Sequence, residues 1–405
     1  MKHLKIWFVV LMTMLLVFSI APFVLHAAAA DSGTCGNNIT WTLDDHGTLT
    51  ISGTGEMEDS FPWAKYKETI QRVVIEEGVT TIAALAFSHY PSLSEVDIPA
   101  SVTEIGHPFS GCTSLTEIHV AEGNASLMSD ENGCIYNKEQ TVLIQYPCGR
   151  KDGTYLIPDG VTTISQFAFY DCPTIQTVTF PDSLTIIEPS AFYHCVSLAE
   201  VFIPAGLTSI GPNAFAICGN CKSFTVSPEN PAFSSDTTGC LYNHDKTILI
   251  QYPCGRTEGS FTIPSSVIRV GRLALSGCKT IYSITIPKSV VSIGWSAFSN
   301  TDNLKDVYYE GKQSGNNKMG ETWEDVSIEG DNHLLELAQK HWETTIKPAP
   351  EETVSAEPSL SDEPSAQSNS SGGNHLLLFV ICAGELVVIL ILAVILLIKK
   401  KPYTH

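Results

Sequence analysis

Residues 178–200 read VTFPDSLTIIEPSAFYHCVSLAE, and residues 201–223 read VFIPAGLTSIGPNAFAICGNCKS. The two blocks have equal length and place apolar, proline, phenylalanine and cysteine residues at matching positions. The end of the first apolar stretch of a block recurs along the chain at Ile75, Ile98, Val120, Ile157, Phe180, Ile203, Val226, Ile263, Ile286 and Tyr309. Successive intervals are 22 or 23 residues, apart from two of 37. A fixed period of this size predicts a protein built from stacked repeats.

A longer duplication contains the short repeat. Gly-Cys-Ile-Tyr-Asn at 133–137 returns as Gly-Cys-Leu-Tyr-Asn at 239–243, and Ile-Gln-Tyr-Pro-Cys-Gly-Arg at 144–150 returns unchanged at 250–256. Both pairs are displaced by 106 residues, and both lie within a long interval. We therefore expect two equivalent hairpin segments, each inserted into the array.

Apolar residues occupy the same repeat positions throughout. One column consists of Ile82, Ile105, Ile164, Ile187, Ile210, Val270 and Ile293, and another of Phe87, Phe109, Phe169, Phe192, Phe215, Leu275 and Phe298. Such residues stack when successive turns of a solenoid lie about 4.8 Å apart, which builds a continuous core that no single repeat could bury. Within a turn, the alternation Val96-Asp97-Ile98 predicts a strand that Pro99 ends.

The repeat phrase from Ile203 through Ala214, Phe215 and Cys218 resembles the BspA-like leucine-rich repeat. The segment 35–43, Cys-Gly-Asn-Asn-Ile-Thr-Trp-Thr-Leu, with 47–55 after it, is similar to the N-terminal module of such surface proteins from Gram-positive gut bacteria. The resemblance covers residues 34–346. It implies a mainly β leucine-rich-repeat solenoid of 22–23-residue repeats, displayed at the cell surface for adhesion or ligand binding. The sortase-type Leu-Pro-x-Thr-Gly signal of a common pattern in the family is missing, so linkage to the wall is not expected.

The two ends of the chain predict export and membrane anchoring. An apolar run ends in the four alanines 27–30, which is typical of a secretory signal cleaved before Asp31; an uncleaved membrane anchor is the alternative. Residues 376–398 carry a single charge, Glu385, and at about 1.5 Å per residue they span a hydrocarbon core of about 30 Å. The three lysines that follow belong on the cytoplasmic side, so the bulk of the chain is expected outside.

These features predict seven regions. They are a signal peptide at 1–30, an N-terminal β cap at 31–65, the solenoid at 66–310, a C-terminal cap at 311–347, a Pro/Ser/Glu-rich stalk at 348–375, a transmembrane helix at 376–398 and a cytoplasmic tail at 399–405. The caps are expected because an open solenoid end exposes apolar core and strand edges. The stalk has too few apolar residues to offset its ordering entropy, so we expect it to be extended.

Composition and motifs argue against several functions. The chain has 23 Lys and Arg against 43 Asp and Glu, a net charge of -20, which disfavours nucleic acid as a partner. The sequence shows no nucleophile elbow, phosphate loop, dinucleotide fingerprint or His-Glu-x-x-His pattern. His194 and Cys195 are neighbours that point to opposite sides, which disfavours a thiolate dyad. We therefore expect no enzymatic activity, no cofactor and no metal.

Most cysteines are interpreted as core residues. One repeat position holds Cys112, Cys172, Cys195, Cys218 and Cys278, which suits small buried side chains between coils. The Cys-Gly-Asn-Cys sequence at 218–221 has redox spacing, but Cys221 stands where the repeat has Leu or Ile, so it too is interpreted as core.

Four further cysteines lie in the inserts of an exported protein, where disulfides are expected. Cys134 recurs with Cys148, and Cys240 with Cys254, which suggests a local disulfide in each insert. If residues 137–140 form a tight turn, however, Cys148 lies about five residues out of register with Cys134, and pairing requires a bend at Pro147. Both alternatives stay open.

Outward residues of consecutive strands predict a binding face, rich in hydroxyl groups with apolar anchors. The candidate ligand-binding residues are Asp97, His119, Leu156, Thr179, Phe202, Thr225, Thr285 and Tyr308. Solenoids bind partners on such extended faces, and exposed aromatic residues form hot spots. A solvated sheet whose threonines merely suit β structure is the alternative. The sequence thus predicts a membrane-anchored surface protein that binds a protein or glycan in adhesion; a structural, envelope-organising protein without a specific ligand is the other hypothesis.

Overall fold

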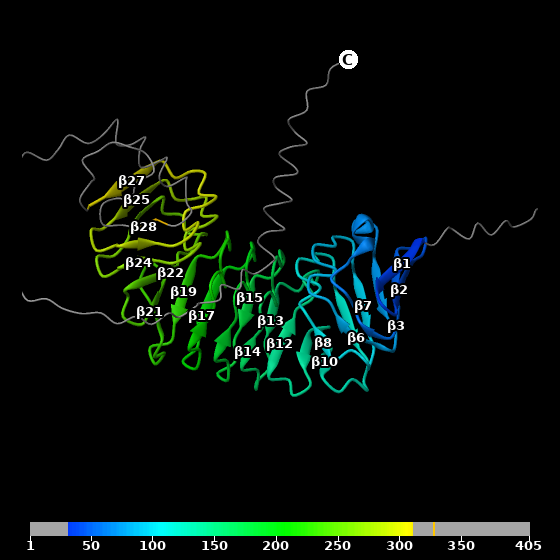
Figure 1. The fold of residues 1–405 in the computed structure, drawn as a ribbon. Coiled ribbons are helices and arrows are strands. Elements are labelled where there is room, and N and C mark those ends of the chain that lie inside the picture. The colour runs from blue at the N-terminus through cyan, green and yellow to red at the C-terminus, as the bar shows by residue number, and fades with distance from the viewer. Residues whose placement is uncertain (1–30, 311–326, 329–405) are drawn as a thin grey trace, which may run out of the picture. The chain divides into compact units, whose positions relative to one another are not determined.

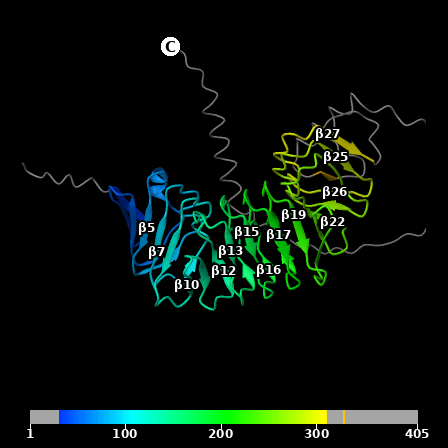
Figure 2. The same ribbon diagram turned by 180° about the vertical axis from the view of Figure 1, so that it is seen from behind.

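The computed structural model describes residues 31–310 and 327–328. They form a mainly β solenoid of about 11 turns, in which successive coils lie side by side in both views (Figures 1 and 2). The described residues include no α-helix, so none that could span a membrane. The predicted signal peptide, stalk, transmembrane helix and cytoplasmic tail lie outside the described residues, as does nearly all of the predicted C-terminal cap.

Ten parallel strands, one from each coil, form a first surface that we call the strand face. They are β5 (Arg72–Ile75), β7 (Glu95–Ile98), β9 (Glu117–Val120), β13 (Thr154–Leu156), β15 (Thr177–Thr179), β17 (Glu200–Ile203), β19 (Ser223–Val226), β23 (Ser260–Thr262), β25 (Ser283–Ile286) and β27 (Asp306–Tyr309). Burial alternates along each strand, as the sequence pattern predicts: Val96 and Ile98 face the core, while Asp97 between them is partly exposed.

Shorter strands form a second ladder, which we call the opposite sheet. They are β4 (Gly55–Glu56), β6 (Val79–Ile82), β8 (Glu104–Ile105), β14 (Thr163–Ile164), β16 (Ile186–Ile187), β18 (Ser209–Ile210), β24 (Arg269–Val270), β26 (Ser292–Ile293) and β28 (Ser327–Ile328). Neighbouring strands pair in parallel from β4 to β8, from β14 to β18 and from β24 to β28.

The two predicted inserts interrupt both the strand face and the opposite sheet. The first contains β10 (Leu127–Ser129), β11 (Ile135–Asn137) and β12 (Val142–Gln145), and the second contains β20 (Phe233–Ser235), β21 (Leu241–Asn243) and β22 (Ile248–Gln251). Strand β12 pairs with β14, and β22 with β24, so β8 and β18 are the last strands of their ladders. We call the breaks after β8 and β18 the first gap and the second gap.

An antiparallel module precedes the coils. It consists of β1 (Asp31–Gly36), β2 (Ile39–Leu43) and β3 (Thr48–Gly53), and β3 pairs in parallel with β5. The 3₁₀-helix η1 (Pro62–Tyr66) buries Trp63, whose ring lies 6.1 Å from that of Trp41 and 5.7 Å from that of Phe87. The aromatic stacking of the core therefore begins in this module, whose capping role stays a prediction.

The predicted columns form the core. The phenylalanine position is buried in every coil, and its rings stack in parallel: Phe169 lies 4.6 Å from Phe192, which lies 5.2 Å from Phe215. The isoleucine column is buried except at Ile105 and Ile210, which are only partly buried. These two residues precede the gaps, so each lacks the coil that would cover it.

The structure decides between the two alternatives left open for the inserts: the local pairing of Cys134 with Cys148 and of Cys240 with Cys254 is wrong. Cys148 bonds to Cys172 and Cys254 to Cys278, while Cys134 and Cys240 are free and buried. The path of each insert explains the difference.

In the first insert the N–H of Tyr146 donates to the carbonyl of Ala168 at 2.9 Å, and its ring stacks on Phe169 at 4.8 Å. The insert therefore runs alongside the next coil, which brings the Cα atoms of Cys148 and Cys172 to 4.5 Å. Cys172 and Cys278, which the sequence suggested were core thiols, are therefore half-cystines. Cys112, Cys195 and Cys218, at the same repeat position, are buried thiols as predicted.

Candidate binding surface

The predicted ligand-binding residues lie on the strand face in four neighbouring pairs. The strand register places Asp97 beside His119, Leu156 beside Thr179, Phe202 beside Thr225, and Thr285 beside Tyr308. Each pair comes from two adjacent coils, so the repeat period alone brings them together.

The apolar anchors are exposed but do not form one group. Leu156 is 69% exposed, Phe202 54% and Tyr308 45%. Strand β15 lies between the strands of Leu156 and Phe202, which at about 4.8 Å per strand separates their Cα atoms by about 10 Å, with Thr179 between them. Tyr308 belongs to the separate sheet β23-β25-β27, beyond the second insert. Leu156 and Phe202 are therefore the two anchors that lie close enough together for one ligand to contact both.

A pocket of about 490 Å³ opens where the first insert interrupts the strand face. We call it the polar pocket; its lining includes Glu117, His119, Asp130, Asn132, Arg150 and Asp152. Within the wall, Arg150 donates to the carbonyl and side-chain oxygens of Asn132 at 3.0 and 3.1 Å and also pairs with Asp152. Asp130 in turn accepts the backbone N–H groups of Asn132 at 2.9 Å and Cys134 at 2.8 Å. These bonds fix donors and acceptors in place, which favours hydrogen bonding to a polar ligand.

Charged residues next to the polar pocket pair with one another. Arg72 Nη2 lies 2.6 Å from Asp97 and 3.3 Å from Glu95, while His119 Nε2 lies 3.3 Å from Glu117. Asp97 is therefore neutralised by Arg72 and is a weaker ligand contact than the sequence suggests, whereas His119 stays exposed on the pocket rim.

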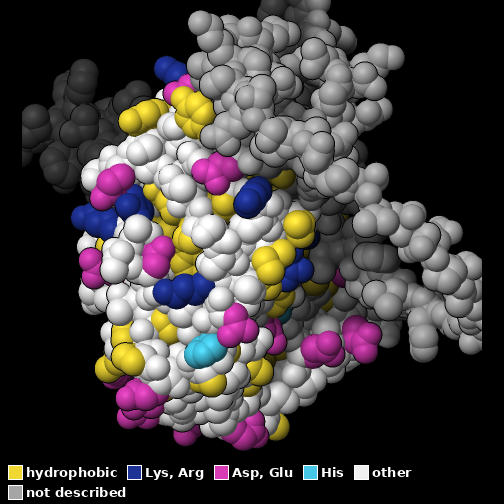
Figure 3. Space-filling model, turned by 90° about the vertical axis from the view of Figure 1, so that its left-hand side faces the viewer, with side chains coloured by type: hydrophobic (Ala, Val, Ile, Leu, Met, Phe, Trp, Pro, Cys, Tyr) yellow, Lys and Arg dark blue, Asp and Glu magenta, His cyan; other side chains and the backbone are white. Residues whose placement is uncertain are grey.

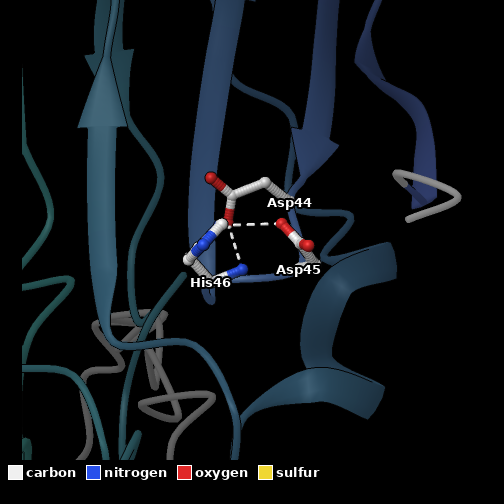
Figure 4. Close-up of side chains that lie close together, drawn as sticks. All are labelled: Asp44, Asp45 and His46. Carbon is white, nitrogen blue, oxygen red and sulfur yellow. Dashed lines mark hydrogen bonds and ion pairs between the residues drawn. The ribbon is translucent and has the colours of Figure 1, made fainter. Parts of the chain in front are cut away.

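Among the residues that the structure describes, two groups of side chains bring together possible metal ligands. Asp44, Asp45 and His46 lie on the turn between β2 and β3 (Figure 4). One oxygen of Asp44 already accepts the backbone N–H groups of His46 and Thr48, at 2.9 and 2.8 Å, so it stabilises the turn. The other group is Glu95, Glu117 and His119, where Arg72 supplies a competing cation. Both groups are explained by these contacts, and we assign no metal to either.

The buried thiols and the histidine beside them do not form a reactive pair. Cys195 is fully buried and donates to the carbonyl of Phe169, whereas His194 is partly exposed and its Nδ1 lies 2.6 Å from Asp171. The hydrogen bond to Asp171 raises the pKa of His194. Burial raises the pKa of Cys221 to about 12, and that of Cys218 is raised by the same cause. Thiolates are the reactive form, so burial disfavours reaction of these thiols near neutral pH.

Sequence reasoning missed the polar pocket. Its residues Asp130 and Arg150 belong to the insert, and they recur as Asp236 and Arg256 in the second one. The duplication could have singled them out as recurring charged residues, but their place in one pocket with His119 depends on how the insert folds back against β9.

The coils define a class of protein, a leucine-rich-repeat solenoid with two inserted hairpins. The model of the BspA type leucine rich repeat region matches residues 63–148, 153–253 and 252–318, in 6 copies. The chain belongs to this family.

Solved structures resemble parts of the chain, while no curated protein matches it. A leucine rich cell surface protein from Faecalibacterium prausnitzii is 27% identical, with a TM-score of 0.43, over 69% of this chain and 76% of that chain. A leucine-rich repeat protein from Eubacterium ventriosum is 19% identical, with a TM-score of 0.36, over 74% and 93%. The pneumococcal vaccine antigen PcpA is 20% identical, with a TM-score of 0.43, over 69% and 70%.

Proposed function

We propose that the protein is a noncatalytic binding protein of the cell surface whose strand face recognises an extracellular protein or glycan, in adhesion. The observation that carries the proposal is the exposed pair Leu156 and Phe202 on a hydroxyl-lined face, close to the polar pocket. Large apolar side chains that are exposed near one another are typical of sites that a partner covers.

The chemistry of the face suits a ligand that extends across several strands. Leu156 and Phe202 offer apolar contact, and Thr179 between them offers a hydroxyl group that donates and accepts hydrogen bonds. The polar pocket adds a fixed guanidinium and fixed carboxylates at one end. A sugar ring or a peptide backbone presents the matching combination of apolar faces and polar edges.

The location is part of the proposal. The signal-like apolar run, the apolar stretch 376–398 and the three lysines after it support a single-pass membrane protein with this face outside and only a short tail inside. The net charge of -20 supports a partner other than nucleic acid.

The test is binding of the protein to an array of host matrix proteins, mucins and glycans. Saturable binding that falls at least about tenfold in Leu156→Ala/Phe202→Ala is expected, because anchor truncations each cost about 1–2 kcal/mol. The matched control is Ile268→Ala/Val291→Ala, which removes two side chains of similar exposure, 47% and 48%, from neighbouring coils of the opposite sheet.

Each other result has a distinct meaning. Binding lost equally in both variants contradicts a site on the strand face. Binding that survives both but falls in His119→Ala moves the site to the polar pocket alone. Absence of saturable binding to every member of the array supports the structural, envelope-organising role instead.

A further inference from the structure

The coil before the second gap, like the coil before the first, has backbone groups that lack the partners supplied elsewhere in the array. Along the opposite sheet, the carbonyl of Ile187 accepts the N–H of Gly211 at 2.7 Å, and that of Val270 accepts the N–H of Gly294 at 2.9 Å. The equivalent carbonyl of Ile210 accepts no hydrogen bond from any described residue.

The same coil has two unpaired N–H groups. Elsewhere the N–H of Ser190 donates to the next coil at 3.1 Å, and that of Phe192 at 2.8 Å. The corresponding N–H groups of Asn213 and Phe215 donate to no described residue, and the buried side-chain oxygen of Asn213 has no hydrogen-bond partner among them either. The N–H groups of Asn213 and Phe215 lie in the turn after β18, where Asn213 has a φ of 62°, and together with the Ile210 carbonyl they can hydrogen-bond to a ligand.

The first gap is closed, whereas the second is open. At the first gap the ring of Phe167 packs edge-on against His107 at 6.1 Å, and the N–H of Gly111 reaches the carbonyl of Tyr170 in the next coil at 3.2 Å. At the second gap Leu273 replaces Phe167, and a groove of about 390 Å³ lies in the described structure. Its lining includes Ile210, Asn213 and Phe215 on one side, and Ile250, Arg269 and Arg272 on the other. We call it the arginine groove.

The charge of the arginine groove is opposite to that of the chain. Its lining contains no Asp or Glu, although the chain carries 43 acidic residues against 23 basic ones. Arg269 is exposed and makes no ion pair with a described residue, and the guanidinium of Arg272 lies over the ring of Trp295 at 4.6 Å. In the duplicate unit the positions of Arg269 and Arg272 hold Thr163 and Gln166, so this charge is particular to the second gap.

An acidic residue near the first gap has no counterpart near the second. Glu188, 106 residues before Gly294, accepts the N–H of Gln166 at 2.8 Å near the first gap. Gly294 lines the arginine groove instead and contributes no carboxylate to the described part of its lining. The end of the array that contains β24 and β26 shows basic, acidic and hydrophobic side chains interspersed on its described surface (Figure 3).

We propose that the arginine groove binds an extended acidic peptide segment of a partner protein. The peptide backbone would hydrogen-bond to the carbonyl of Ile210 and to the N–H groups of Asn213 and Phe215, its carboxylates would face Arg269 and Arg272, and its apolar side chains would contact Ile250. This site lies on the opposite sheet and is independent of ligand binding at the strand face.

The test measures fluorescence anisotropy of labelled nine-residue peptides with the full chain. A peptide that alternates Glu and Val is expected to bind at least about tenfold more tightly than one that alternates Gln and Val, and its affinity should fall as salt is raised, because the contacts are ionic. A peptide that alternates Lys and Val should not saturate. Equal binding of all three peptides overturns the proposal.

Variants locate the site. Arg269→Gln/Arg272→Gln is expected to weaken binding of the Glu peptide about tenfold or more. Arg269→Gln alone, which alters an exposed side chain, should weaken it at least about threefold without loss of folding by circular dichroism. The matched control is Thr163→Ala/Gln166→Ala at the closed gap, which should leave binding unchanged. Equal loss in this control, or no loss in the arginine variants, contradicts the site.

A last measurement separates backbone hydrogen bonding from simple charge attraction. N-methylation of alternate amides of the Glu peptide should weaken binding at least about tenfold when it removes the amide that donates to the Ile210 carbonyl. Methylation of the other amides should have little effect. Equal, small effects of both would overturn the backbone hydrogen bonds.

Discussion

The stacked phenylalanine column should contribute strongly to local stability, and Phe192→Ala tests it. Phe192 is fully buried, and its ring lies 4.6 Å from Phe169, 5.2 Å from Phe215 and 5.7 Å from Phe180. Truncation of a buried Phe costs about 3–5 kcal/mol, and ring pairs add about 0.5–1.5 kcal/mol beyond area burial. Because the substitution removes the ring that all three pairs share, we expect local stability to fall by about 4 kcal/mol or more.

The chain supplies a matched control ten residues away. Phe202 is 54% exposed on the strand face, so Phe202→Ala leaves no cavity and should cost less than about 1 kcal/mol. The assay is hydrogen–deuterium exchange of backbone amides in residues 160–220, because a repeat array opens locally rather than as one unit. A decrease of about 4 kcal/mol accelerates exchange about 1000-fold in the coils around residue 192.

Two results would refute this reasoning. One is exchange in Phe192→Ala within about threefold of that in Phe202→Ala. The other is acceleration spread evenly over residues 31–310, because coils that contact only their neighbours should confine the effect.

Three other predictions follow from the cysteines and from His194. Mass spectrometry of the unreduced protein should show a linked peptide pair containing Cys148 and Cys172; a pair that links Cys134 to Cys148 would contradict the structure. The seven free cysteines of the described residues are buried, so Ellman's reagent at pH 8 should leave them unmodified until urea is added; rapid reaction in native buffer would show that they are exposed. Because the pKa of His194 is raised by Asp171, this pair stabilises the fold below the unfolded pKa of about 6.5 and loses that effect as pH rises through the folded pKa. The stability of Asp171→Asn to urea should therefore fall further below that of the wild type at pH 5.5 than at pH 8.5, and an equal deficit at both would remove the charge from the explanation.

The repeat positions of the core could be predicted because each coil contacts only its neighbours. A residue 23 positions along the chain is then a spatial neighbour, so Phe169 and Phe192 stack as the column suggests. The same rule predicts which strand-face residues lie side by side, such as Phe202 and Thr225.

The inserts could not be predicted in the same way, because they break this rule. The hairpin register places Tyr136, rather than Cys134, opposite Leu143, and the insert then follows the next coil as far as Cys148. Its contacts are tertiary, so neither the disulfide to Cys172 nor the polar pocket follows from spacing. Recurrence after 106 residues marks these residues as structural but does not identify their partners.

The 106-residue duplication gives the molecule a coarse unit of growth. Each unit contains one insert, and one disulfide joins that insert to the coil that follows it. A third unit spliced between the existing two would create only junctions of a kind that the fold already contains. Recombination between duplicated segments could thus lengthen or shorten the array in whole steps, and each step would change the number of strands on the strand face.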